Sequence, residues 1–266
     1  MKNPNYILLA VLVILSAAVS CKKDNPKGKY GVDGVTPLPE AVDLGTVVNG
    51  KNIKWASFNL GASKEYEYGD YYAWGETSAK TDYSWATYAY ATYDYATGYY
   101  DKLSKYCPKD KTGFWGVTNK EPDGEVMLLP SDDVAHVKLG GKWRMPTPDE
   151  INALLALKAK EDYTWEKWTF ATDADGNMIK DARGNVIFGI RITRKSTGAT
   201  LFLPAADCFD GKTVGEDAGI FGFYWSSSLN PGDPDSAFIL YFYSDGSVRD
   251  DYDRYYGLSV RPVWEE

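Results

Sequence analysis

The sequence predicts a mixed α+β fold in which two short helices accompany many short antiparallel strands. Runs of alternating apolar and polar residues are separated by Gly-containing turns such as Asn49-Gly50, which is typical of β-hairpins. Residues 147–159 have the cap and the apolar spacing of an amphipathic helix. Strands and helices do not alternate regularly along the chain, which argues against a doubly wound parallel sheet.

The first 21 residues predict the compartment. Lys2 precedes an apolar run that is too short for a comfortable membrane span but fits a secretory signal. Ala18-Val19-Ser20-Cys21 resembles a bacterial lipobox, with Ala18 in place of the usual Leu. We therefore expect a lipoprotein signal peptide over 1–20 and lipidation of Cys21. An ordinary secretory signal cut near Cys21 is the alternative.

Residues 21–38 are polar and rich in Pro and Gly, which predicts a flexible tether between a membrane anchor and a folded domain. The lysines and the acid after Cys21 resemble the surface-export signal of Bacteroidetes lipoproteins. The expected location is the outer membrane, lipid-anchored and facing outward. Residues 39–266 are long enough for one large domain. The formal net charge of -8 argues against a nucleic-acid partner, which needs a basic footprint.

The expected elements follow in chain order. Residues 40–48 and 52–62 form a hairpin around Asn49-Gly50. A short helix follows Ser131, which is a good N-cap and precedes two acids that suit a first helical turn. The next helix has Thr147 as its N-cap and Pro148 at its first position, and Glu150 completes a capping box. Its apolar side chains at 151, 154 and 155 make it a core element.

The second half of the chain reads as further short strands. Residues 163–207 alternate with a period of two and contain several Gly turns, which predicts hairpins. Three more strands are expected around Tyr224–Ser226, Ala237–Tyr243 and Leu258–Val263. Trp225 is interpreted either as a core anchor or as the floor of a pocket.

Several phrases occur in a specific order: "DLG", "KWASFNLGAS", "EYGDYYAWGET", "LGGKWRMPTPDEINALL", "GATLFLPAAD", "YWSSS" and "YGLSVRPV". As a set they resemble the Fibrobacter succinogenes major paralogous domain family of Bacteroidetes lipoproteins over nearly all of residues 40–264. That family is similar to the wider C-type-lectin-like group. The resemblance implies that 39–266 form a C-type-lectin-like domain, with a twisted antiparallel sheet, two short flanking helices and long loops that present a binding surface.

Residues 66–100 contain thirteen Tyr or Trp and no Ile, Leu, Val or Met. Tyr and Trp combine an apolar ring with a polar tip. One interpretation is a tyrosine-rich segment that covers the domain's own core. The other is a binding surface on which sugars or peptides stack. Its candidate ligand-binding residues are Tyr71, Tyr72, Trp74, Tyr88 and Tyr90, followed by Tyr93 and Tyr95, with Trp225 as a possible pocket floor.

A second candidate surface is the loop-like segment 241–257. Its Tyr, Ser and Asp residues are typical of binding loops on a rigid scaffold. The candidates are Tyr243, Asp245, Arg249, Tyr252 and Tyr255, with Ser244, Asp250 and Arg254 beside them. The alternative is a solvated hairpin tip.

Recognisable catalytic chemistry is not expected. His136 is the only histidine and lies in no nucleophile motif. The calcium-like spacing that begins at Asp173 has its Gly too early, and Gly184 stands where a loop would need Glu. An ion at Asn230, Asp233 and Asp235 is not expected either. Whether Cys107 and Cys208 pair stays open at this stage. We therefore assign no catalytic residue, cofactor or metal.

The sequence predicts a cell-surface lipoprotein with a non-catalytic domain that binds a glycan or a protein ligand through aromatic and acidic loops. The alternative is a structural or assembly component of a surface or fimbrial complex. In that case the aromatic stretch would be a subunit interface.

Overall fold

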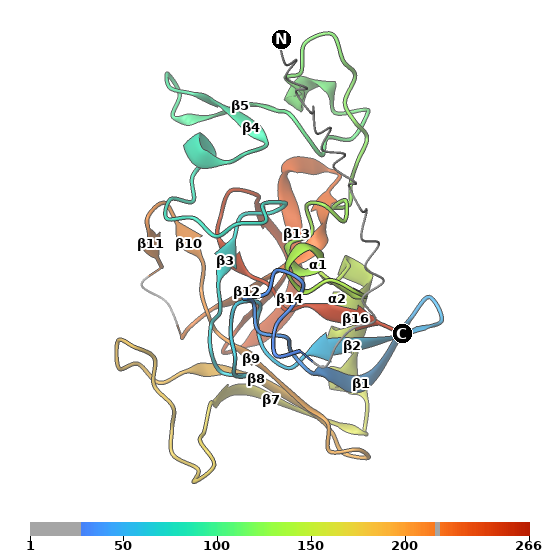
Figure 1. Cartoon of the computed structure of the whole chain (residues 1–266), viewed down its shortest axis with the longest axis vertical. Coiled ribbons are helices and arrows are strands. Elements are labelled where there is room, and N and C mark those ends of the chain that lie inside the picture. The colour runs from blue at the N-terminus through green and yellow to red at the C-terminus, as the bar shows by residue number, and fades with distance from the viewer. Residues whose placement is uncertain (1–27, 216–218) are drawn as a thin grey trace, which may run out of the picture.

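The computed structural model describes residues 28–215 and 219–266 (Figure 1). Cys21, the signal peptide and the start of the tether lie outside the described residues, so their roles stay predictions. The described part is an α+β fold of small, mainly antiparallel sheets with two short α-helices, as the sequence predicts.

A four-stranded sheet joins the beginning and the end of the domain. Strands β1 (Ala41–Val48) and β2 (Lys51–Ala56) pair around Asn49 and Gly50, which both have positive φ, as a two-residue hairpin turn requires. Strand β16 (Val263–Glu265) lies between β2 and β6 (Trp143–Arg144). The predicted hairpin is confirmed.

A five-stranded sheet, in the order β14-β13-β12-β15-β3, forms the centre of the molecule. Its strands are β3 (Tyr71–Tyr72), β12 (Gly222–Asn230), β13 (Asp233–Tyr243), β14 (Gly246–Asp253) and β15 (Leu258–Ser259). The pair β12–β15 is parallel and the others are antiparallel. The expectation of loops over 241–257 is wrong for 246–253, because Tyr243 pairs with Gly246 across a tight turn and β14 continues the sheet.

The remaining elements are short. A three-stranded sheet contains β7 (Tyr163–Phe170), β8 (Phe188–Arg194) and β9 (Thr200–Pro204), and two hairpins contain β4 (Ala91–Asp94) with β5 (Tyr99–Leu103) and β10 (Phe209–Asp210) with β11 (Thr213–Val214). Single 3₁₀ turns occur at Trp85–Thr87, Thr112–Phe114 and Ala156–Ala159. The β4–β5 hairpin and the loop after it stand away from the other sheets (Figure 1).

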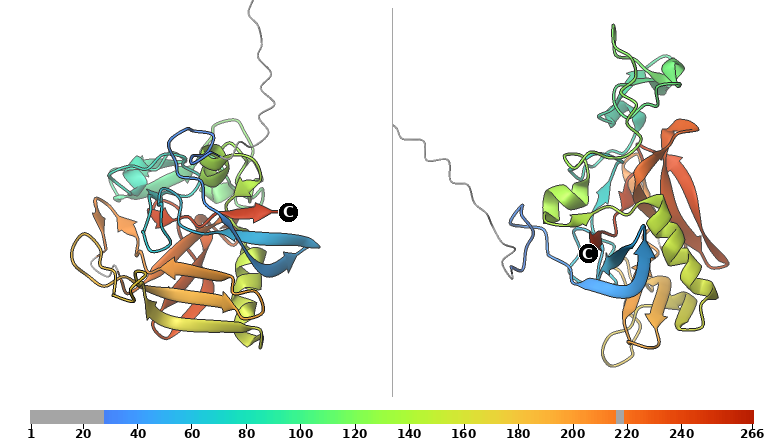
Figure 2. Two further views of the ribbon diagram at one scale, coloured as in Figure 1. Left: turned by 60° about the horizontal axis from the view of Figure 1, so that its bottom comes forward. Right: turned by 90° about the vertical axis from the view of Figure 1, so that its right-hand side faces the viewer.

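Helix α1 (Val134–Leu139) begins two residues after the start that a Ser131 cap implies. Its N-cap is Asp133, not Ser131, because Asp133 Oδ1 accepts the backbone N–H of His136 at 3.0 Å. Helix α2 (Pro148–Leu155) has the predicted capping box between Thr147 and Glu150. It lies along the five-stranded sheet (Figure 2, right).

Both faces of the five-stranded sheet are covered near its middle. Because side chains alternate along a strand, Trp225 and Ile239 enter one buried cluster, whereas Tyr224 and Leu240 enter another. The second cluster also contains Ile151 of α2, which confirms that this helix is a core element. On the sheet face that carries Trp225, the side chains of β14 are exposed at Val248 and Asp250.

Candidate functional sites

The aromatic stretch supplies a core of the domain. Tyr71, Tyr72, Trp74 and Tyr88 are buried, and so is Trp225. The expectation that these five rings face a ligand is therefore wrong, and the interpretation that the stretch covers the domain's own core is confirmed. Tyr90 is half-buried, and its ring packs edge-on against Tyr88 and Tyr106.

The polar tips of these rings are satisfied inside the protein. Trp74 Nε1 donates to the carbonyl of Ser226 at 2.9 Å, and Trp225 Nε1 donates to the carbonyl of Tyr72 at 2.7 Å. Tyr88 Oη donates to the carbonyl of Trp74 at 2.9 Å. Backbone carbonyls thus replace water around amphipathic rings. This is why a segment without branched aliphatic residues can be a core.

A different set of rings lies at the surface of the five-stranded sheet, and we call it the aromatic shelf. Along it the ring centroids are 5.6 Å apart for Tyr243 and Tyr241, 4.9 Å for Tyr241 and Phe223, and 5.2 Å for Phe223 and Tyr252. The row continues from Tyr252 to Tyr256 at 4.5 Å. The complete shelf is Phe221, Phe223, Tyr241, Tyr243, Tyr252, Tyr255 and Tyr256.

Strand register places these rings together. Phe223 of β12 lies opposite Tyr241 of β13, and side chains two residues apart along a strand share a face. Tyr243 is 37% exposed, whereas Phe223 is mostly covered by its neighbours. The shelf is therefore an aromatic surface whose outer rings reach solvent and whose inner rings hold it in place.

The shelf borders a cavity of about 300 Å³ that includes Asp250 and Tyr252. Burial raises the pKa of the Tyr241 and Tyr252 hydroxyls above the ordinary tyrosine value. Both hydroxyls therefore stay protonated at neutral pH and can donate and accept hydrogen bonds. Asp250 adds an exposed carboxylate to the same cavity.

The structure brings together only part of the predicted C-terminal set. Tyr243, Tyr252 and Tyr255 belong to the shelf. Arg249 lies opposite Leu240, so it points to the other face of β14, where its guanidinium lies 4.8 Å from the Phe238 ring centroid. Asp245 is exposed in the turn between β13 and β14. The expectation that Arg249 acts on the same surface as these tyrosines is wrong.

Sequence reasoning missed four shelf rings: Phe221, Phe223, Tyr241 and Tyr256. The spacing Phe221-x-Phe223 and Tyr241-x-Tyr243 is a signal, because it places each pair on one face of a strand. The register that puts Phe223 beside Tyr241 depends on the β12–β13 pairing and is not readable from composition.

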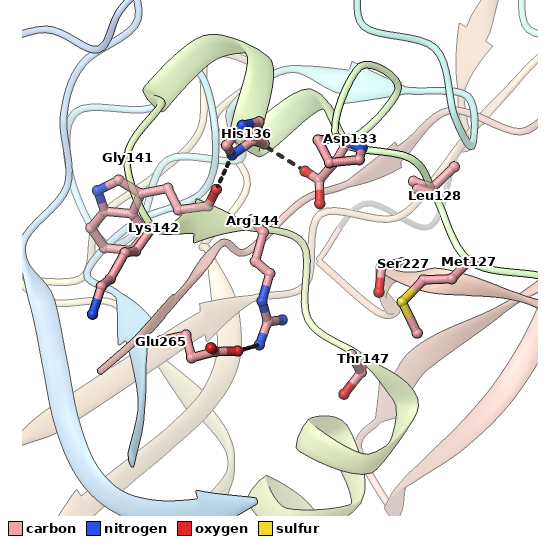
Figure 3. A pocket seen from close by; sticks show the side chains of 12 residues that line it. Met127, Leu128, Asp133, His136, Gly141, Lys142, Arg144, Thr147, Ser227 and Glu265 are labelled. Atoms are coloured by element: carbon pink, nitrogen blue, oxygen red, sulfur yellow. Dashed lines mark hydrogen bonds and ion pairs between the residues drawn. The ribbon is translucent and has the colours of Figure 1, made fainter. Parts of the chain in front are cut away.

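A larger cavity of about 500 Å³ lies beside His136 (Figure 3). It is bounded by α1, β6, the N-terminus of α2 and Ser227 of β12. His136 Nδ1 lies 3.2 Å from the carbonyl of Trp143, and because a carbonyl only accepts, Nδ1 is the donor of this hydrogen bond. Asp133 caps α1 through Oδ1 and accepts the backbone N–H of Met145 through Oδ2 at 2.8 Å.

Arg144 and Glu265 at this cavity are paired within the protein. Arg144 donates to both carboxylate oxygens of Glu150, at 2.8 and 2.5 Å, and to Glu265 at 3.1 Å. Burial lowers the pKa of Arg144, but its pairs with Glu150 and Glu265 raise it above its ordinary value, and hydrogen bonds from Lys51 and Arg144 lower the pKa of Glu265, so both stay charged. The groups support the fold here and do not converge on a shared reacting position.

The acids of the β12–β13 turn form a separate cluster. Hydrogen bonding to Asp235, together with burial, raises the pKa of Asp233 to about 6. Burial raises the pKa of Asp253 to about 6 as well, with the Asp235 charge adding to it. Asn230 donates to Asp251. Within residues 28–215 and 219–266 no group of three or more metal-ligating side chains is placed to hold a metal ion.

The calcium-like spacing at Asp173 forms a turn. Asp173 Oδ1 accepts the backbone N–H groups of Asp175 and Asn177 at 3.0 and 2.9 Å.

Cys107 and Cys208 are both buried and free, so they do not form a disulfide. Burial raises the pKa of both thiols, that of Cys208 to about 12, which keeps them protonated and unreactive.

Comparisons with protein-family models, curated proteins and solved structures found no match to this chain. Among the described residues, no helix has the length and apolar character needed to cross a membrane.

Proposed function

We propose that this protein is a lipid-anchored cell-surface protein whose C-type-lectin-like domain binds a glycan without catalysing a reaction. In this proposal the aromatic shelf is the contact surface. The observation that carries it is the continuous row of rings from Tyr243 to Tyr256, with the tyrosines partly exposed, beside a cavity that contains the Asp250 carboxylate.

The chemistry of the shelf suits a sugar. Pyranose rings present C–H groups that pack on aromatic faces, and their hydroxyls need nearby donors and acceptors. Tyr241 supplies both a ring and a protonated hydroxyl, Tyr252 supplies a ring whose hydroxyl hydrogen-bonds with the Cys208 thiol, and Asp250 supplies an acceptor. The inner ring Phe223 fixes the tyrosines in position, which lowers the entropic penalty of binding.

The single carboxylate at this cavity, in the described part of the chain, supports binding without hydrolysis. Glycosidases generally use two carboxyl groups on either side of the scissile bond. Among the described residues that line the cavity at the shelf, Asp250 is the only acid.

The burial of rings in the aromatic stretch gives less support to the alternative assembly role. It required the rings of 66–100 to be available to another subunit, but Tyr71, Tyr72, Trp74 and Tyr88 are buried within this chain. A protein ligand at the aromatic shelf is the remaining alternative, and the same test addresses it.

The test is a glycan array with three forms of the protein. The wild type is compared with Tyr241→Ala/Tyr243→Ala and with a matched control, Tyr93→Ala/Tyr95→Ala. The control removes another surface pair, whose centroids are 4.9 Å apart and in which Tyr95 is 87% exposed.

We expect the shelf variant to bind its glycan at least about tenfold more weakly, which corresponds to about 1.4 kcal/mol, and the control to bind like the wild type. Equal binding by all three forms would refute the shelf as the site. Failure of the wild type on the array, with shelf-dependent capture of a protein, would replace the glycan by a protein ligand.

A further inference from the structure

The cavity beside His136 is separate from the aromatic shelf. It has a volume of about 500 Å³, within the range of about 300–1,000 Å³ typical of small-molecule sites. A neighbouring cavity of about 350 Å³ shares Met127 and Thr147 with it. No residue that lines either cavity lines the cavity at the shelf. The two sites can therefore be tested independently.

The wall of this cavity favours an uncharged ligand. Met127, Leu128, Pro130 and Trp143 supply apolar surface. Arg144 is paired with Glu150 and Glu265, and Glu265 is also paired with Lys51. The Asp133 carboxylate is bound by backbone N–H groups. The other charged side chain of the wall, Lys142, is exposed to solvent. Apart from the solvent-exposed Lys142, these groups offer no free partner to a charged ligand, and an unpaired charge in an apolar site is costly.

One polar group at the cavity has no partner. Ser227 lines the cavity, is 4% exposed, and its hydroxyl makes no hydrogen bond within the described residues. Buried hydroxyls are nearly always bonded, and leaving one unpaired is unfavourable. The preceding serine is different, because Ser226 Oγ donates to the carbonyl of Ser228 at 3.3 Å.

The mouth of the cavity can adapt. Met127 lies beside Ser227, where Figure 3 shows its thioether next to the serine side chain, and it is 49% exposed. An unbranched thioether side chain rearranges easily around a ligand. Its displacement would give a ligand access to the Ser227 hydroxyl.

We propose that this cavity binds a small, uncharged, apolar molecule that carries one hydroxyl, and that this hydroxyl hydrogen-bonds to Ser227. The apolar body packs on Met127, Leu128 and Trp143. The ligand thereby satisfies the unpaired serine, which the protein alone leaves without a partner.

Three probes of similar shape separate the parts of this proposal: p-cresol, toluene and p-toluate. Binding to the full chain is followed by NMR of ¹³C-labelled methionine methyl groups. Met127 lies in the cavity wall, and Met178 is an exposed internal control in the loop between β7 and β8. We expect p-cresol to shift Met127 and bind about tenfold more tightly than toluene, p-toluate to bind most weakly, and Met178 to stay unchanged.

Two serine variants test the contact. Ser227→Ala should weaken p-cresol binding by about tenfold and leave toluene binding unchanged. Ser247→Ala is the matched control, because Ser247 is also buried with an unpaired hydroxyl but lies outside the cavity. It should leave the binding of both probes unchanged.

The proposal is overturned if no probe shifts Met127, if Met127 and Met178 shift alike, or if Ser227→Ala binds p-cresol as the wild type does. None of these outcomes bears on the aromatic shelf. Failure of glycan binding at the shelf leaves this test intact.

Discussion

Replacing Trp74 by Ala tests whether the aromatic stretch is core or surface. Trp74 is fully buried. Removing a buried Trp side chain costs about 3–5 kcal/mol. The carbonyl of Ser226 then loses the indole donor, which adds about 1–3 kcal/mol. The guanidinium of Arg254 also loses a ring 5.4 Å away. Because these losses overlap, we expect a decrease of about 5 kcal/mol in the free energy of unfolding.

The assay is urea unfolding followed by far-UV circular dichroism, with Tyr95→Ala as the control for an exposed ring. Domains are typically stable by about 5–15 kcal/mol, so Trp74→Ala should leave the protein barely folded or unfolded. Trp74→Phe, which keeps most of the volume, should lose clearly less. A decrease below about 1 kcal/mol for Trp74→Ala would show that this ring is not a core residue and would refute the reasoning.

Three further predictions concern the stability of the folded domain. Thr147→Ala removes the α2 cap and should cost about 1 kcal/mol in urea unfolding, whereas Thr147→Ser should cost little. Tyr88→Phe removes the donor to the Trp74 carbonyl and should cost about 1 kcal/mol, and an unchanged unfolding midpoint would contradict it. The folded pKa of Asp253 is raised to about 6, above its unfolded value, so the folded state binds more protons between these values and stability rises as pH falls from 7 to 5. Solvent screening limits this gain to about 1 kcal/mol. Asp235→Asn, which removes the neighbouring charge, should reduce the gain, and a wild type that loses stability over this pH interval would contradict the assignment.

Local signals in the sequence predicted the elements that local chemistry controls. Asn49-Gly50 fixes the first hairpin, and Thr147 with Glu150 fixes the start of α2. Asp133, and not Ser131, caps α1, and its second carboxylate oxygen accepts the backbone N–H of Met145, a partner that the local sequence does not reveal.

The candidate site was less predictable, because a Tyr or Trp in the sequence does not show on which side of a sheet it lies. Trp74 and Tyr88 find backbone carbonyls from distant or folded-back segments, and these partners exist only in the tertiary fold. Tyr241 and Phe223 meet through strand register. The many rings of 66–100 therefore predicted a binding surface where the structure has a core. Of the shelf, the sequence predicted only Tyr243, Tyr252 and Tyr255.

The most direct test of the aromatic shelf is photo-crosslinking from position 248. Val248 is 48% exposed and lies opposite Tyr241 on β14, so a benzoylphenylalanine there reaches a ligand on the shelf while the rings stay in place. We predict strong crosslinking to the bound glycan from position 248 and little from the exposed position 95. Equal crosslinking from the two positions, or crosslinking from position 95 alone, would contradict the proposal that the shelf is the binding surface.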